Sequence, residues 1–330
     1  MRRRQFIGLI GGAAAWPIVR PPLARAQPGL PVIGFVNGGS PDGFASRVAA
    51  FRKGLTETGT VEGQNVMVEY HWLEGRYDRL PALMADLVHR GVAVIATPGS
   101  NASALAAKAA TSTIPIVFGV GDDPVKLGLV ASLNQPSGNA TGINFFVQEV
   151  TAKRLGLLHD LVPTAARIAV LVNPANASSA EATLREITEP ARALGVKIQV
   201  LNAGTSREIE AAIAALVRER ADALFVGGDA FFIGRRVQFA TLAMRHGIPA
   251  AYPARDFVEV GGLMSYSTDS VDMYRQAGVY TSQILKGAKP ADLPVLQSSK
   301  FEFVLNLQTA RALGIEVPNS LQLLADEVIE

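Results

Sequence analysis

Residues able to contact a small molecule gather in short loops that follow apolar segments. Gly99, Ser100 and Asn101 come directly after an apolar run and open a helical segment, and Ser40 lies in a glycine-rich loop after an earlier apolar run. Small residues at such points let a ligand approach backbone N–H groups at the positive end of a helix, which suits a carboxylate. The alternative is that Ser100 acts only as an N-cap and Ser40 only as part of a tight turn.

Acidic residues form a second group of candidates. Asp122 and Asp123 are adjacent at the end of an apolar run, where they could hold an ammonium group or form an Asx turn before Pro124. Asp229 also follows an apolar run and stands close to Phe231. A carboxylate beside an aromatic ring suits a cationic or aromatic part of a ligand. Alternatively, Asp229 caps the next helix and Phe231 packs in a core.

Four further candidates lie in the second half of the chain. Tyr252, Arg255 and Asp256 follow an apolar run in the position that corresponds to the Asp122 loop of the first half. Asn173 ends the first strand expected there. We expect these residues to face the same ligand, although Arg255 and Asp256 could instead pair with each other.

The sequence carries no motif for cofactor or nucleophilic chemistry. No loop matches a dinucleotide fingerprint or a Walker loop, and the segment 38–42 lacks the last glycine of a nucleophile elbow. The four histidines are scattered without metal-ligand spacing, and there is no cysteine. We therefore expect no catalytic residue, no metal and no cofactor, and a binding protein rather than an enzyme.

The elements that would position these residues alternate between apolar strands and helical segments. Continuous apolar strands separated by helices are typical of parallel sheets that helices cover on both faces. The expected strands are Val32–Val36, Val66–Tyr70, Val92–Ala96, Ile114–Phe118, Thr141–Asn144, Ile168–Val172, Val196–Leu201, Ala223–Val226 and Pro249–Tyr252.

The two halves of the chain repeat this pattern. Val32-Ile-Gly-Phe-Val-Asn37 parallels Ile168-Ala-Val-Leu-Val-Asn173, and later segments align as well. The repeat predicts two Rossmann-like, doubly wound parallel-sheet lobes, which bind ligands beyond the carboxyl ends of their strands. We expect lobe 1 to contain residues 31–144 and about 262–295, and lobe 2 residues 145–261 and about 296–330.

Two facing lobes also need crossovers, which act as hinges. The candidate crossovers are 141–147, the Gly261-Gly262 region and 293–299.

Residues 1–26 have the pattern of an export signal. Arginines precede a short apolar run, and Ala24-Arg25-Ala26 forms a small-x-small cleavage site, while the start is twin-arginine-like. Removing the five arginines of this segment from the 31 basic side chains leaves 26 against 29 acidic ones, so nucleic-acid binding loses its support. We expect cleavage after Ala26 and a periplasmic product; a disordered or membrane-anchoring N-terminus is the alternative.

Several stretches are similar to one family of transport proteins. They include Tyr77-Asp-Arg-Leu-Pro-Ala-Leu83, Gly128-Leu-Val-Ala-Ser-Leu-Asn134, Ala169-Val-Leu-Val-Asn-Pro174, Gly261-Gly-Leu-Met-Ser-Tyr266 and Lys289-Pro-Ala-Asp-Leu-Pro294. Over nearly all of residues 31–330 the chain resembles the periplasmic binding component of ABC transporters, in the family that includes tryptophan-binding members.

This resemblance implies a type I periplasmic-binding fold with three hinge crossovers, in which the ligand is captured between the lobes and delivered to a permease in the inner membrane. It also implies that the loops at Ser40, at Gly99-Ser100-Asn101 and at Asp122-Asp123 hold the ligand's carboxylate and amine.

The expected function is therefore capture of a small solute, such as an aromatic amino acid or an aromatic acid, by a monomeric protein. A ligand-sensing module for a membrane receptor and an α/β enzyme are the alternatives.

Overall fold

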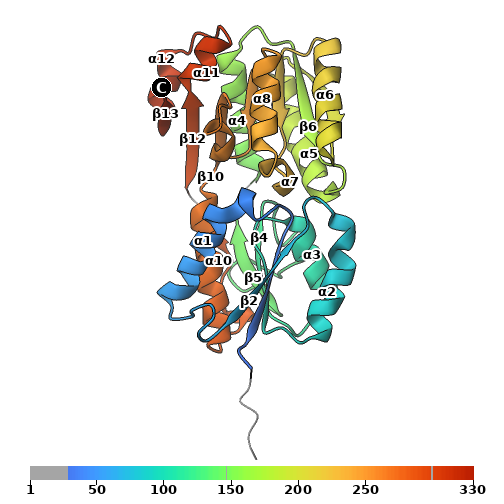
Figure 1. The fold of residues 1–330 in the computed structure, drawn as a ribbon, viewed down its shortest axis with the longest axis vertical. Helices are drawn as coiled ribbons and strands as arrows, with labels where there is room; N and C mark the ends of the chain where they lie inside the picture. The colour runs from blue at the N-terminus through green and yellow to red at the C-terminus, as the bar shows by residue number, and fades with distance from the viewer. Residues whose placement is uncertain (1–28, 146, 299) are drawn as a thin grey trace, which may run out of the picture.

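The protein consists of two α/β lobes stacked along the long axis of the molecule (Figure 1). The computed structural model describes residues 29–145, 147–298 and 300–330. The expected signal segment and its cleavage site lie outside these residues. None of the helices in the described part of the chain combines the length and the apolar character that crossing a bilayer requires.

Lobe 1 is built around a parallel sheet that has, among the described residues, six strands in the order β11-β5-β4-β3-β1-β2. Its strands are β1 (Val32–Asn37), β2 (Met67–Trp72), β3 (Val94–Thr97), β4 (Ile116–Val120), β5 (Ala140–Asn144) and β11 (Leu296–Gln297). Its helices are α1 (Ala45–Glu57), α2 (Leu80–His89), α3 (Asn101–Ala110) and α10 (Ser270–Leu285), with short 3-10 turns η1 (Asp42–Phe44), η2 (Tyr77–Arg79) and η3 (Pro290–Asp292).

Helices cover both faces of this sheet, which explains why its strands are apolar throughout. Ile33 and Phe35 of β1 point into a core with α1 and α10, whereas Val36 joins a second core with α2 and α3. Successive side chains of a strand point to opposite faces, so a strand buried on both sides needs apolar residues at consecutive positions.

Lobe 2 contains the second sheet, with seven described strands in the order β13-β12-β10-β9-β8-β6-β7. The pairing is parallel except between β10 and β12. Its strands are β6 (Arg167–Val172), β7 (Lys197–Asn202), β8 (Ala223–Val226), β9 (Ala250–Tyr252), β10 (Met264–Thr268), β12 (Phe301–Asn306) and β13 (Glu327–Ile329). Its helices are α4 (Val147–Leu161), α5 (Ala177–Ala193), α6 (Ser206–Arg218), α7 (Ala230–Ile233), α8 (Arg236–Arg245), α9 (Arg255–Val258), α11 (Leu307–Ala312) and α12 (Asn319–Leu324).

The two sheets share one strand order, which confirms the two-lobe α/β fold. In the first sheet β2-β1-β3-β4-β5 are neighbours, and in the second β7-β6-β8-β9-β10 follow the same sequence. β10 is therefore the counterpart of β5 and belongs to lobe 2, where it pairs with β9 and β12. The boundary expected near residue 262 is corrected accordingly, because the chain leaves lobe 2 only after Thr268.

In the part of the chain that the structure describes, the backbone passes three times from one sheet to the other. These crossovers follow β5, β10 and β11, so the second crossover lies between Thr268 and Ser270 rather than at Gly261-Gly262. Thr268 Oγ1 donates a hydrogen bond of 2.8 Å to the carbonyl oxygen of Phe145 and thereby links the first two crossovers.

Helix α10 returns the chain to lobe 1 and packs closely against α1. A Cβ on Gly54 would lie 1.9 Å from the carbonyl oxygen of Arg275, and one on Gly278 would lie 2.1 Å from that of Phe51. Only glycine allows this approach, so α10 is held firmly in lobe 1 while its first turn faces lobe 2.

Candidate ligand-binding site

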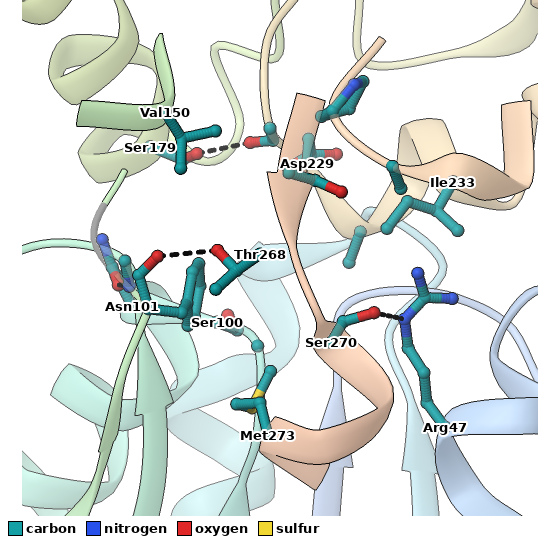
Figure 2. A pocket seen from close by; sticks show the side chains of 18 of the residues that line it. Arg47, Ser100, Asn101, Val150, Ser179, Asp229, Ile233, Thr268, Ser270 and Met273 are labelled. Carbon is teal, nitrogen blue, oxygen red and sulfur yellow. Dashed lines mark hydrogen bonds between the residues drawn. The ribbon is translucent and has the colours of Figure 1, made fainter. Parts of the chain in front are cut away.

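A cavity of about 150 Å³ lies between the lobes, at the carboxyl ends of both sheets (Figure 2). A site of this size holds on the order of ten waters or a small organic molecule. Lobe 1 contributes Phe44, Arg47, Gly99, Ser100, Asn101, Gly121, Phe145, Ser270, Met273 and Tyr274. Lobe 2 contributes Val150, Thr151, Arg154, Asn176, Ser179, Thr183, Gly228, Asp229, Ala230, Ile233, Pro253, Ala254, Ser267 and Thr268.

The start of α3 forms one wall of the cavity. Ser100 caps the helix, because its Oγ accepts a hydrogen bond of 3.1 Å from the backbone N–H of Ser103. Gly99 has a φ of +87°, and a Cβ there would meet the Tyr274 hydroxyl at 2.8 Å. That hydroxyl donates to the carbonyl oxygen of Pro98 and accepts from Asn37 Nδ2. The turn before α3 is thus fixed by lobe 1 alone and presents the helix's positive end to the cavity.

Asp229 lies on the opposite wall and is fully hydrogen-bonded. Its Oδ1 accepts from Asn173 Nδ2 at 3.1 Å and from the backbone N–H of Phe231 at 3.0 Å, so it caps α7. Its Oδ2 accepts from Asn176 Nδ2 at 2.8 Å and from the hydroxyl of Tyr77, a lobe 1 residue, at 3.0 Å. Burial raises the pKa of Asp229, although these four donors oppose the shift.

An ion pair between the lobes closes one side of the cavity. Arg47 of α1 binds Asp256 of α9 through both carboxylate oxygens, at 2.9 and 2.7 Å. Its Nε also donates to Ser270 Oγ at 3.0 Å (Figure 2). Burial opposes ionisation of Asp256, but the hydrogen bonds and charge of Arg47 outweigh it and hold the pKa of this carboxyl below its ordinary value.

Arg154 of α4 is the second buried arginine at the cavity, and its surroundings differ. Its guanidinium lies 4.3 Å from the centre of the Phe225 ring, and Nη2 donates to the carbonyl oxygen of Val226 at 3.3 Å. Its Nε is buried without a hydrogen-bond partner. Burial lowers the pKa of Arg154 to about 9, and no carboxylate among the described residues offsets this.

Four of the residues chosen from the sequence line the cavity: Gly99, Ser100, Asn101 and Asp229. Asp122 and Ser40 lie just outside it, at the contact between the lobes. Asp122 Oδ2 accepts from Asn101 Nδ2 at 2.9 Å, and its Oδ1 is 3.5 Å from the guanidinium of Arg185 in lobe 2. Ser40 faces Gly234 of lobe 2, since a Cβ on that glycine would lie 3.2 Å from Ser40 Oγ.

The remaining residues chosen from the sequence contact other parts of the protein and do not line the cavity. Asp123 makes the Asx turn, since its Oδ1 accepts from the backbone N–H of Val125 at 2.9 Å. Asn173 orients Asp229, and Phe231 packs in the lobe 2 core. Tyr252 is fully buried and stacks on Phe257 with ring centres 4.8 Å apart.

Arg255 and Asp256 do not pair with each other. Arg255 binds Glu259, Glu302 and Glu327, all within lobe 2, while Asp256 reaches across to Arg47. The two side chains of adjacent residues in helix α9 point in different directions, so each finds a different partner.

Arg47 and Arg154 are the two charged lining residues that motif searching missed, and periodicity could have found them. Arg154 shares the apolar stripe of α4 with Val150, Leu157 and Leu158, which are all buried. Arg47 lies one turn before buried Phe51 on α1. A charged residue on the apolar stripe of a helix signals either a buried partner or a ligand contact.

The family model for ABC transporter substrate-binding proteins matches residues 31–329. The chain belongs to that family. A curated relative, a tyrosine-binding protein from Clostridioides difficile (strain R20291), is 27% identical over 269 residues, which are 81% of this chain and 76% of the relative.

Two solved structures are similar to this substrate-binding protein to different degrees. An ABC domain from Streptococcus pneumoniae in complex with L-Trp is 26% identical, with a TM-score of 0.81 over 91% of this chain and 100% of that one. A ligand-free, open substrate-binding protein from Clostridium difficile is 25% identical, but its TM-score is 0.60 over 91% of this chain and 99% of that one. At nearly equal identity and coverage, this protein superposes more closely on the complex with L-Trp than on the open, ligand-free structure.

Proposed function

We propose that this protein is the extracytoplasmic solute-binding component of an ABC importer. It captures a small solute between its two lobes and delivers it to a permease in the inner membrane. The observation that carries the proposal is the cavity at the meeting of the two sheets, which side chains from both lobes enclose. A ligand that contacts both lobes favours their closed arrangement over the open one, and closure can thus report that the protein is loaded.

Aromatic amino acids and aromatic acids are the proposed ligands. The relatives named for tyrosine and L-Trp support this class. Phe44, Phe145, Met273 and Tyr274 supply an apolar, largely aromatic wall in this chain. Rings of a ligand pack well against such side chains.

The proposal includes export. The segment 1–26 directs the chain out of the cytoplasm and is removed after Ala26, which leaves a monomeric periplasmic protein without metal or cofactor. The arginines, apolar run and small-x-small site of this segment support this step.

A thermal-shift screen of the exported protein against aromatic amino acids and aromatic acids tests ligand capture. A ligand at about 100 times its Kd stabilises the folded state by about 2.7 kcal/mol, so the Tm rises by several degrees. Delivery is tested by uptake of the hit in its host with and without the gene. We expect uptake at low concentration to be lost without the gene and restored by the wild-type copy. Unchanged uptake, or a screen without any hit, contradicts the proposal.

A further inference from the structure

We propose that Arg154 binds the ligand's carboxylate, and that the protein therefore selects small carboxylates with an apolar, aromatic-sized body. This inference rests on the proposed function, because it assigns the ligand's charged group within the same cavity.

The guanidinium of Arg154 has donors to spare. It carries five N–H groups, and within the described chain only one bond is formed, from Nη2 to Val226. The residue is 3% exposed, so bulk water does not replace the missing partners. Its packing on Phe225 fixes the plane of the group in lobe 2. A planar, fixed fork of donors matches the two oxygens of a carboxylate.

The charge of Arg154 is not balanced by the protein residues that the structure describes. Asp256 is bound by both nitrogens of Arg47, and Asp229 already accepts from four donors. A buried charge without a counter-ion is strongly unfavourable, and the single cation–π contact offsets only part of it. A ligand carboxylate supplies the missing charge and the acceptors together.

The rest of the cavity suits the same ligand. α3 begins beside the cavity, with Ser100 as its N-cap and no acidic residue in its first turn, so its N-terminal end adds positive potential. Apolar side chains from both lobes, including Phe145, Val150 and Ile233, provide a surface for the ligand's body. A small inorganic anion would leave this apolar surface without a partner.

Calorimetry with matched ligand pairs tests the inference. The probes are L-tryptophan with L-tryptophanamide, and 3-(indol-3-yl)propionate with its primary amide, since each amide keeps the shape but loses the negative charge. Of the two acids, the one with the higher affinity for the wild-type protein should bind about 100-fold more tightly than its own amide.

Arg154→Met should abolish this preference, so that acid and amide bind within about threefold of each other. Arg154→Lys keeps the charge without the fork and should retain an intermediate preference. The matched control is Arg235→Met, which removes another arginine stacked on a phenylalanine of lobe 2, 5.1 Å from the Phe231 ring and outside the cavity. It should retain the wild-type preference.

The outcomes separate the two proposals. Equal binding of acid and amide by the wild-type protein, or an unchanged preference in Arg154→Met, overturns the role of Arg154 while capture of a solute stands. Absence of binding by every acid and amide, confirmed by an absence of stabilisation in the thermal-shift screen, overturns the proposed function itself.

Discussion

Two buried arginines face the same cavity from opposite lobes, and their environments are opposite. Both Arg47 and Arg154 are 3% exposed. Arg47 is bound by both carboxylate oxygens of Asp256, a residue of the other lobe. Arg154 has one backbone carbonyl and one aromatic ring as its partners in the described chain, both within its own lobe.

The difference teaches how closure can depend on a ligand. The Arg47–Asp256 pair joins the two lobes, so it stabilises the closed arrangement whatever the cavity holds. Arg154 is desolvated in that arrangement, so closure without an anion is penalised. The first contact makes closing favourable, and the second makes it conditional on a carboxylate.

Breaking the Arg47–Asp256 ion pair should have the largest effect on ligand affinity. Asp256→Ala leaves Arg47 buried without a counter-ion in the closed form, which costs about 3–5 kcal/mol. We therefore expect the affinity for the solute found in the screen to fall by about 100-fold or more. Calorimetry measures this loss, and small-angle scattering at saturating ligand should show a more open molecule.

Asp292→Ala provides the control, because Asp292 is an exposed carboxylate of η3 in lobe 1. It should bind like the wild-type protein. An Asp256→Ala variant that binds and closes normally would show that the pair does not support closure.

Removing the unpaired charge should act in the opposite direction on the ligand-free protein. Arg154→Met replaces a buried, unpaired charge by an apolar side chain of similar length, which removes the desolvation penalty of that charge. Without ligand, the variant should thus be more closed than the wild-type protein, seen as a smaller radius of gyration in scattering. A variant as open as the wild-type protein, or more open, contradicts the penalty assigned to Arg154.

The contact between Asp122 and Arg185, in which the arginine is exposed, should matter least among the contacts between the lobes. The Asp122–Arg185 pair is 3.5 Å long, and the Arg185 side chain is 57% exposed. Such pairs contribute about 0–1 kcal/mol, so Asp122→Asn should change the affinity at neutral pH by less than about fivefold.

Asp122 should also make the affinity for the ligand depend on pH, and Asp122→Asn tests this. Burial raises the pKa of Asp122 in the closed form, although Arg185 opposes the shift. Closing of the lobes therefore favours proton uptake at the Asp122 carboxyl. The protonated carboxyl adds to the affinity at low pH, and this gain is lost as the pH rises through the raised pKa. As the pH falls from about 7 to about 4, near the ordinary pKa of an aspartate, wild-type affinity should rise slightly, while Asp122→Asn should not show this rise. An equal rise in both proteins assigns it to another group.

Most of the fold could be predicted because strands buried on both faces require apolar runs. Val32–Val36 was expected where β1 spans Val32–Asn37, and Ala223–Val226 coincides with β8. β10 escaped because Met264-Ser-Tyr-Ser-Thr268 alternates polar and apolar residues, and Tyr266 and Thr268 are only partly buried. Alternation of this kind suits a strand beside an antiparallel neighbour. A search for continuous apolar runs therefore did not detect β10 as a fifth strand of lobe 2.

The site was predictable only where it depends on local structure. Ser100 and Asp229 follow strands and cap helices, so their loops could be assigned to the cavity from the chain alone. Asp256 binds Arg47, which lies 209 positions away in the sequence and in the other lobe. Periodicity can place an arginine inside a helix packing face, but the presence or absence of its partner depends on how the lobes meet.

A crystal structure of the exported protein with the solute retained through gentle purification tests the account most directly. We expect closed lobes and one small molecule in the cavity, with its carboxylate at hydrogen-bond distance from the Arg154 guanidinium and its apolar body against Phe44, Phe145 and Met273. A solute in the cavity whose carboxylate lies away from Arg154, or a solute bound outside the space between the lobes, would contradict it.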